Sequence, residues 1–155
     1  MSKKTAAKTA SKTTAKKPAP PFDKARWDPG LVKAHKGYVD AINSNETDRV
    51  MAMYDKGVAV MQPDGPLVTG HRQVRKWVAD YFKTTQTHWT KVSTAMWVGG
   101  DYGFDQGIDS AVDIPRDGGP TLRYTVKGIL IYKRQTNGEW LVYRDIWNNN
   151  SPSRS

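Results

Sequence analysis

The chain has 155 residues, a formal net charge of +9 and no cysteine. This length fits one domain with a substantial core, and the lack of cysteine excludes disulfides, thiolate metal sites and cysteine nucleophiles. No apolar run reaches the roughly 18 residues of a membrane span, and the N-terminus lacks the apolar core of a secretory signal, so we expect a cytoplasmic protein with no membrane partner.

Residues 1–21 form a Lys/Ala/Thr-rich segment that carries six of the nine net charges. Its lysines are Lys3, Lys4, Lys8, Lys12, Lys16 and Lys17. With so little apolar surface to bury, this tail is expected to be disordered, as is the short segment 151–155. The lysines could hold nucleic acid nonspecifically through phosphates, or the tail could be a solubilising extension, since no aromatic residue lies between the lysines to stack on bases.

A folded domain is predicted over residues 22–150, beginning with helices. Apolar residues recur at helical spacing over 28–44, 46–54 and 70–83, and a strand over 57–62 separates the second helix from the third. Four strands then follow, separated by glycine-rich turns, over 88–98, 104–114, 121–134 and 139–148. Helices followed by an antiparallel meander are typical of the α+β class.

The last two predicted strands flank a turn at Thr136-Asn137-Gly138, which predicts a β-hairpin because Asn-Gly adopts positive backbone dihedrals at little steric cost. On the second of these strands, Tyr143, Asp145 and Trp147 alternate, so we expect them to share one inward face together with Leu141. An acid on a buried face must be paired, solvated or neutralised.

Several short motifs, in order along residues 27–150, resemble the SnoaL-like superfamily. They are YVDAIN at 38–43, MYD at 53–55, VMQPDG at 60–65, VTG at 68–70, GDY at 100–102 and DIWN at 145–148. The resemblance implies the cystatin-like, or nuclear transport factor 2-like, cone. In that fold three N-terminal helices pack on a curved antiparallel sheet and leave an apolar pocket between them. The fold hosts several enzyme classes as well as pure binding modules, so it does not by itself imply a chemistry.

Ketosteroid isomerase, a distant relative under this resemblance, needs a carboxylate base, a donor tyrosine and a second, protonated acid in one apolar pocket. The resemblance places Tyr38 at the donor tyrosine, Gln62 at the base and Leu130 at the second acid. An amide cannot accept the proton and leucine cannot donate a hydrogen bond. The isomerase mechanism is therefore not carried over.

Asp145 is the acid that the pocket offers instead, and with Tyr38 it forms the candidate catalytic pair. The resemblance directs a further set of side chains towards the pocket as candidate ligand contacts: Gln62, Trp77, Tyr81, Tyr124, Leu130, Tyr143 and Trp147. Burial would raise the pKa of Asp145 towards the range useful for proton transfer. Alternatively, Asp145 makes a structural hydrogen bond, for example to Tyr38, and has no chemical role.

Other polar residues give weaker signals. His35, His71 and His88 are dispersed without the spacing of a metal site, so we predict neither a metal nor a cofactor. Three aspartates share one face of a predicted strand, and this pattern is typical of a solvated sheet face. They are Asp105, Asp109 and Asp113.

Two compatible hypotheses about function follow. In the first, the protein binds a small, largely apolar molecule and acts on it weakly as an isomerase, dehydratase or hydrolase by acid–base chemistry. In the second, it is a non-catalytic homodimeric scaffold whose basic tail contacts nucleic acid or another anionic partner. Ile129 and Ile131 would then lie beside polar neighbours on the convex sheet face and form the dimer interface. Whether the protein is an enzyme is left open by its sequence.

Overall fold

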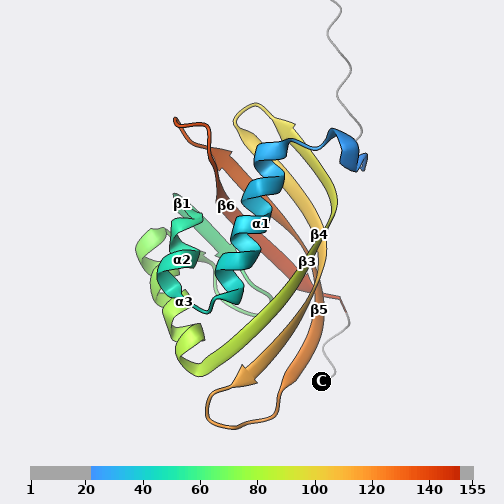
Figure 1. Ribbon diagram of the computed structural model, residues 1–155. Coiled ribbons are helices and arrows are strands. Elements are labelled where there is room, and N and C mark those ends of the chain that lie inside the picture. The colour runs from blue at the N-terminus through green and yellow to red at the C-terminus, as the bar shows by residue number, and fades with distance from the viewer. Residues whose placement is uncertain (1–21, 151–155) are drawn as a thin grey trace, which may run out of the picture.

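The computed structural model describes residues 22–150, and the basic tail and the last five residues lie outside the described part of the chain. Figure 1 shows a strongly curved sheet that wraps around a layer of helices. The helices, in chain order, are η1 (Lys24–Arg26), α1 (Pro29–Asn43), α2 (Thr47–Ala52) and α3 (His71–Thr84). The strands are β1 (Tyr54–Met61), β2 (Val68–Thr69), β3 (Thr85–Gly99), β4 (Tyr102–Pro115), β5 (Leu122–Arg134) and β6 (Trp140–Asn149).

The sheet has the strand order β2-β1-β6-β5-β4-β3 and does not close into a barrel. Long antiparallel pairs join β3 to β4, β4 to β5 and β5 to β6, whereas β1 runs parallel to β6. The sheet is therefore mixed, and the purely antiparallel sheet expected from the sequence is corrected at this one pair. The predicted α+β class, with three helices on a curved sheet, is confirmed.

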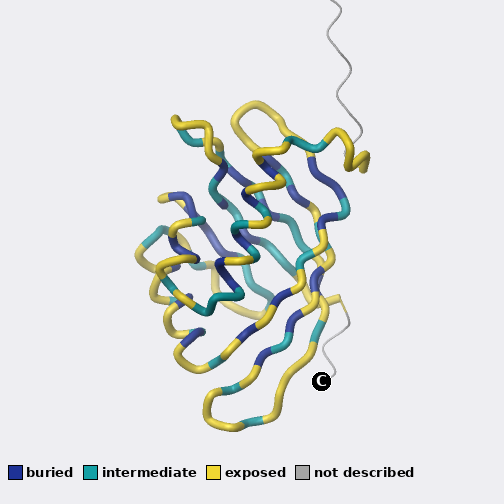
Figure 2. Tube along the Cα trace, in the orientation of Figure 1, coloured by how far each residue is buried: buried dark blue, intermediate teal, exposed yellow. Residues whose placement is uncertain are grey.

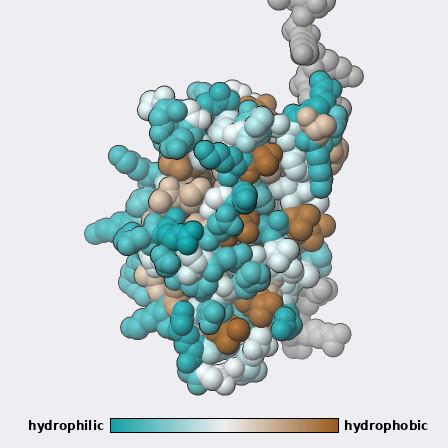
Figure 3. Space-filling view, viewed as in Figure 1, coloured by the Kyte–Doolittle hydropathy of each residue, from teal (hydrophilic) through white to brown (hydrophobic). Residues whose placement is uncertain are grey.

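Helix α1 supplies the centre of the core. Asp28 caps its first turn, because its Oδ1 accepts a hydrogen bond of 2.9 Å from the Leu31 amide, and Pro29 occupies the first helical position. The buried residues recur at helical spacing and are Leu31, Ala34, Tyr38, Ala41 and Ile42. Figure 2 shows this buried stripe facing the sheet, while the outer side of the helix is exposed. On the face in Figure 3, the helix layer presents mainly hydrophilic side chains to solvent.

Two asparagines fix the C-terminal end of α1 against β3. The Asn43 side chain donates to the Trp89 carbonyl (2.9 Å) and accepts from the Trp89 amide (2.7 Å). Asn45 makes the same pair of bonds with the Thr87 carbonyl (2.9 Å) and amide (2.7 Å). Since each amide side chain matches one strand residue, α1 is held in a defined register along β3, and Tyr38 is thereby placed over the inner face of the sheet.

The predicted hairpin between β5 and β6 is present, with Gly138 at φ +85° in its turn. Further along, Val142 lies opposite Tyr132 but Arg144 lies opposite Ile131, so Tyr143 is an extra residue in β6. This bulge shifts the alternation by one position. Val142 and Asp145 are consequently both buried, although they are three residues apart.

The expectation that Tyr143 points inward with Asp145 is therefore wrong. Its ring lies on the outer face, where the Arg144 guanidinium carbon is 3.6 Å from the ring centroid and the Tyr102 ring is 5.9 Å away. Strict alternation in a strand holds only where the ladder is regular, and the sequence carries no signal for the bulge.

Candidate active site

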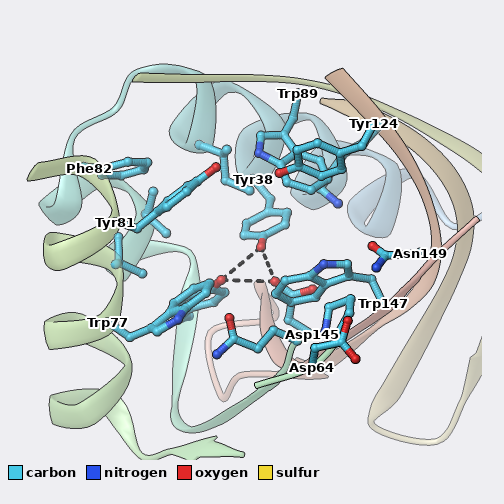
Figure 4. A pocket seen from close by; sticks show the side chains of 17 residues that line it. Tyr38, Asp64, Trp77, Tyr81, Phe82, Trp89, Tyr124, Asp145, Trp147 and Asn149 are labelled. Atoms are coloured by element: carbon cyan, nitrogen blue, oxygen red, sulfur yellow. Dashed lines mark hydrogen bonds between the residues drawn. The ribbon is translucent and has the colours of Figure 1, made fainter. Parts of the chain in front are cut away.

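A cavity of about 320 Å³ lies between α3, α1 and the inner face of the sheet. Eight of the 17 residues that line it are aromatic, and their rings come from six different elements. They are Tyr38, Tyr54, Trp77, Tyr81, Phe82, Trp89, Tyr124 and Trp147. Figure 4 shows Trp77, Tyr81 and Phe82 on one side of the cavity, with Trp89, Tyr124 and Trp147 on the other. Asp64 and Asn149 also line the cavity and are exposed, which places them at its mouth.

Asp145 lies in the cavity wall with only 7% of its surface exposed. Its Oδ2 accepts a hydrogen bond of 2.5 Å from the Tyr38 hydroxyl and lies 3.2 Å from the Tyr54 hydroxyl. The two hydroxyl oxygens are 2.9 Å apart, which completes the triangle of dashed lines in Figure 4. Both hydrogen bonds described for this carboxylate end on Oδ2. No hydrogen bond is described for Oδ1, the other oxygen of this carboxylate.

Burial raises the pKa of Asp145 above its ordinary value, while the charge of Lys91 and the hydrogen bonds from Tyr38 and Tyr54 act in the opposite direction. Burial, followed by the charge of Asp145, raises the pKa of Tyr38 and of Tyr54 well above the usual range. Both tyrosines thus keep their protons and act as donors. The arrangement is a carboxylate held in place by two hydroxyl groups, with its proton affinity increased by an apolar surrounding.

Lys91 brings a positive charge to the same cavity. Its ammonium lies 2.6 Å from Asp109 Oδ2, and both side chains are 9% exposed. The ammonium is also 4.9 Å from the centre of the Trp89 ring and 5.9 Å from that of Tyr38, which is within the range of a cation–π contact. Sequence analysis missed this residue, because a lysine on a strand normally keeps its ammonium in water.

The expectation that the aspartates of β4 form a solvated face is wrong. Asp105, Asp109 and Asp113 are 3%, 8% and 8% exposed and lie on the inner face of the sheet. Each has a polar partner on a facing element: Asp105 Oδ2 lies 2.6 Å from His35 Nδ1 on α1, and Asp109 pairs with Lys91 on β3. Period-two spacing shows that three residues share a face but not which face is buried.

Asp113 organises the other end of the cavity. Its Oδ1 accepts hydrogen bonds from the Tyr81 hydroxyl (2.7 Å) and the Thr87 hydroxyl (2.5 Å), and its Oδ2 accepts one from the Tyr124 hydroxyl (2.9 Å). Burial is the main cause that raises the pKa of Tyr81 to about 12 and the pKa of Tyr124 well above its usual range. Since Tyr81 and Tyr124 line the cavity, Asp113 holds two of its aromatic walls in position.

The remaining candidate contacts divide into two groups. Gln62, Trp77, Tyr81, Tyr124 and Trp147 all line the cavity together with the candidate pair Tyr38 and Asp145. Leu130 does not line it. This residue is buried opposite Asp145 in the β5–β6 pair and lines a separate space of about 20 Å³. The expectation that Leu130 and Tyr143 line the cavity is therefore wrong.

The geometry also bears on other classes of protein. Among residues 22–150, no group of three or more His, Cys, Asp or Glu side chains could hold a metal ion. No helix in this part of the chain is both long and apolar enough to cross a membrane.

The fold and the site together define a cone-shaped α+β protein with a polar cluster inside an aromatic pocket. Residues 35–143 match the model of the SnoaL-like domain, and the chain belongs to this family. No curated protein matches the chain significantly.

Solved structures with the same fold share little sequence with the chain. A ketosteroid isomerase-like protein from Erwinia carotovora atroseptica is 17% identical, with a TM-score of 0.72 over 79% of this chain and 95% of that one. A nuclear transport factor 2-like protein from Salmonella enterica is 13% identical, with a TM-score of 0.70 over 80% and 91%. A candidate dehydratase of the same superfamily from Streptomyces avermitilis is 14% identical, with a TM-score of 0.67 over 79% and 95%. These likenesses support the fold.

Proposed function

We propose that this protein binds a small, largely apolar molecule in its aromatic cavity and that Asp145 performs acid–base chemistry on it, as in an isomerase, a dehydratase or a hydrolase. The observation that carries the proposal is the state of Asp145: one carboxylate oxygen is held by tyrosine hydroxyls and the other remains for a ligand. The description of one structural neighbour as a candidate dehydratase agrees with this class of reaction.

The physical basis is the balance of proton affinity at Asp145. An ordinary aspartate is a weak base near neutral pH, and the raised pKa of Asp145 brings it closer to the range in which a group both accepts and returns a proton. Tyr38 and Tyr54 orient the carboxylate through Oδ2, so proton exchange with a ligand falls to Oδ1. The aromatic walls bind the apolar part of the ligand and exclude water from it.

Asp145→Asn tests the proposal, because it keeps the shape of the side chain and removes the charge and the proton-accepting oxygen. After a substrate has been found by screening, the variant should lose turnover, or only affinity if Asp145 merely binds. Asp113→Asn is the control for the loss of a buried carboxylate. Asp113 accepts hydrogen bonds from three hydroxyl groups and positions Tyr81 and Tyr124, so its variant should weaken ligand binding without removing the proton-accepting group. If Asp145→Asn melts several degrees early but handles ligands normally, Asp145 is structural and the proposal fails.

A second candidate function is a homodimeric scaffold, and the outer face of the sheet favours it. A shallow groove on this face has apolar walls from three strands: Ile108 on β4, Ile129 on β5 and Ile146 on β6. Ile108 is 51% exposed. Such an apolar surface would suit pairing with a second copy of the chain. In this proposal the lysine tail contacts nucleic acid, and the tail lies outside the described residues. The proposal also includes a cytoplasmic location.

A further inference from the structure

We propose that the ligand of the aromatic cavity is a small organic cation, such as an ammonium with apolar substituents, held between ring faces and Asp145. This inference rests on the proposed function and specifies the class of ligand for the same site. It arises from three features of the cavity: its excess of carboxylates, its aromatic walls and the unpaired oxygen of Asp145.

Carboxylates outnumber cationic groups around the cavity. Among the described residues, Asp64 and Asp145 line it directly, while Asp109 and Asp113 lie behind it and bond to lining side chains. Lys91 is the ammonium that faces the cavity within residues 22–150, and Asp109 pairs with it at 2.6 Å. The charges of Lys91 and Asp109 cancel. The remaining carboxylates leave a net negative charge around the cavity, although the overall charge of the chain is positive.

The aromatic walls are suited to a cation. The face of an aromatic ring carries partial negative charge and attracts ammonium groups within about 6 Å of its centre. The cavity already shows this contact, because the Lys91 ammonium lies 4.9 Å from the centre of the Trp89 ring. Across the cavity from Trp89, the Trp77 and Tyr81 rings are stacked 6.2 Å apart. The Trp147 ring, on the side of Trp89, reaches to within 6.3 Å of the Trp77 ring and is tilted by 51° against it. These rings offer further surface for an ammonium with apolar substituents.

Asp145 favours a positively charged ligand over a neutral one in this cavity. The side chain is 7% exposed, and the hydrogen bonds described for it end on Oδ2. A neutral apolar ligand would leave Oδ1 desolvated and without a partner, which is unfavourable for an ionised carboxylate. An organic cation would supply the opposite charge there and apolar surface elsewhere. A bare metal ion would not fit, because no group of three or more ligating side chains is present in the described residues.

Binding of two probes of nearly equal shape tests the inference. Phenyltrimethylammonium and tert-butylbenzene differ by one nitrogen in place of one carbon and by one positive charge. Their affinities for the full-length protein can be compared at pH 7.5 from the indole N–H signals of Trp77, Trp89 and Trp147 in NMR titrations. The cation should bind about tenfold more tightly or better. In Asp145→Asn, affinity for the cation should fall much more than affinity for the neutral probe.

A pH series on the wild-type protein keeps the test decisive even if Asp145→Asn fails to fold. The titratable and charged groups that face Asp145 come from five elements: Tyr38 on α1, Tyr54 on β1, Lys91 on β3, Asp109 on β4 and Tyr132 on β5. Since the cation prefers the ionised carboxylate, its affinity should rise as the pH increases through the pKa of Asp145, while that of the neutral probe should not. Equal binding of the two probes, or tighter binding of tert-butylbenzene, would overturn the cation inference and leave the proposed pocket function standing. If neither probe binds, both fail.

Discussion

The hydroxyl of Tyr38 lies 2.5 Å from Oδ2 of Asp145, across 107 positions of sequence. One residue lies on the helix that the two asparagines attach to β3, and the other follows the bulge in β6. The contact therefore joins the helix layer to the sheet at the wall of the cavity. It serves the fold and the candidate chemistry together.

Removing the Tyr38 hydroxyl should destabilise the protein more than removing that of Tyr54. Hydrogen bonds to charged groups contribute about 1.5–3 kcal/mol, and the bond from Tyr38 is the shorter of the two, at 2.5 Å against 3.2 Å. Tyr38→Phe should lower the free energy of unfolding within that range and Tyr54→Phe by less, as measured by urea denaturation. The reverse order would contradict the geometry of the triangle.

The stability of the protein should respond to the ionisation of Asp145. Because burial raises the pKa of Asp145 in the folded state above its unfolded value, the folded state holds this proton more tightly. The contribution of Asp145 to stability is full below the unfolded pKa and is lost as the pH rises through the folded pKa. Relative to wild type, Asp145→Asn should therefore become more stable as the pH rises above 3.8, the ordinary pKa of aspartate, and through the folded pKa. A stability difference that stays constant over this range in urea titrations would refute the shift.

Dimerisation through the outer sheet face predicts about twice the chain mass in light scattering at micromolar concentration. Ile131→Lys should weaken the dimer, and so should Ile108→Lys, which is the cleaner substitution because Ile108 is 51% exposed and contributes little to the core. A replacement on the opposite side of the molecule, such as Val32→Lys on the exposed side of α1, is the control. A monomeric wild-type protein would end this proposal.

Nucleic-acid binding by the lysine tail predicts strong dependence on salt. Up to six phosphate contacts from Lys3 to Lys17 would give a slope of log affinity against log salt of up to about −0.9 per contact on duplex DNA. Deleting residues 1–21 should abolish binding and leave the melting temperature unchanged. Equal binding by the truncated and full-length proteins would remove the tail from any such role.

Much of the fold was accessible from the sequence because it depends on local patterns. The helical spacing in α1 and the Asn-Gly turn before β6 each have a direct physical cause, and the family motifs set their order. The site was predicted only in part. Asp145 was expected in the pocket, but Tyr143 was placed beside it because a β-bulge leaves no mark in the alternation of residues.

The buried charges were harder to predict for a different reason. Period two places Asp105, Asp109 and Asp113 on one face, and aspartates are seldom buried without a partner. Their partners His35 and Lys91 lie on other elements, so only the tertiary arrangement shows that this face is the inner one.

The most direct test of the central claim is a titration of the Asp145 side-chain carboxyl by carbon-13 NMR in the full-length protein, with its signal assigned by its loss in Asp145→Asn. The midpoint should lie above the ordinary aspartate value of 3.8, and it should change further when a ligand occupies the cavity. A carboxyl that titrates at or below the ordinary value, and whose midpoint no cavity ligand changes, would contradict the assignment of Asp145 as the acid–base group of this pocket.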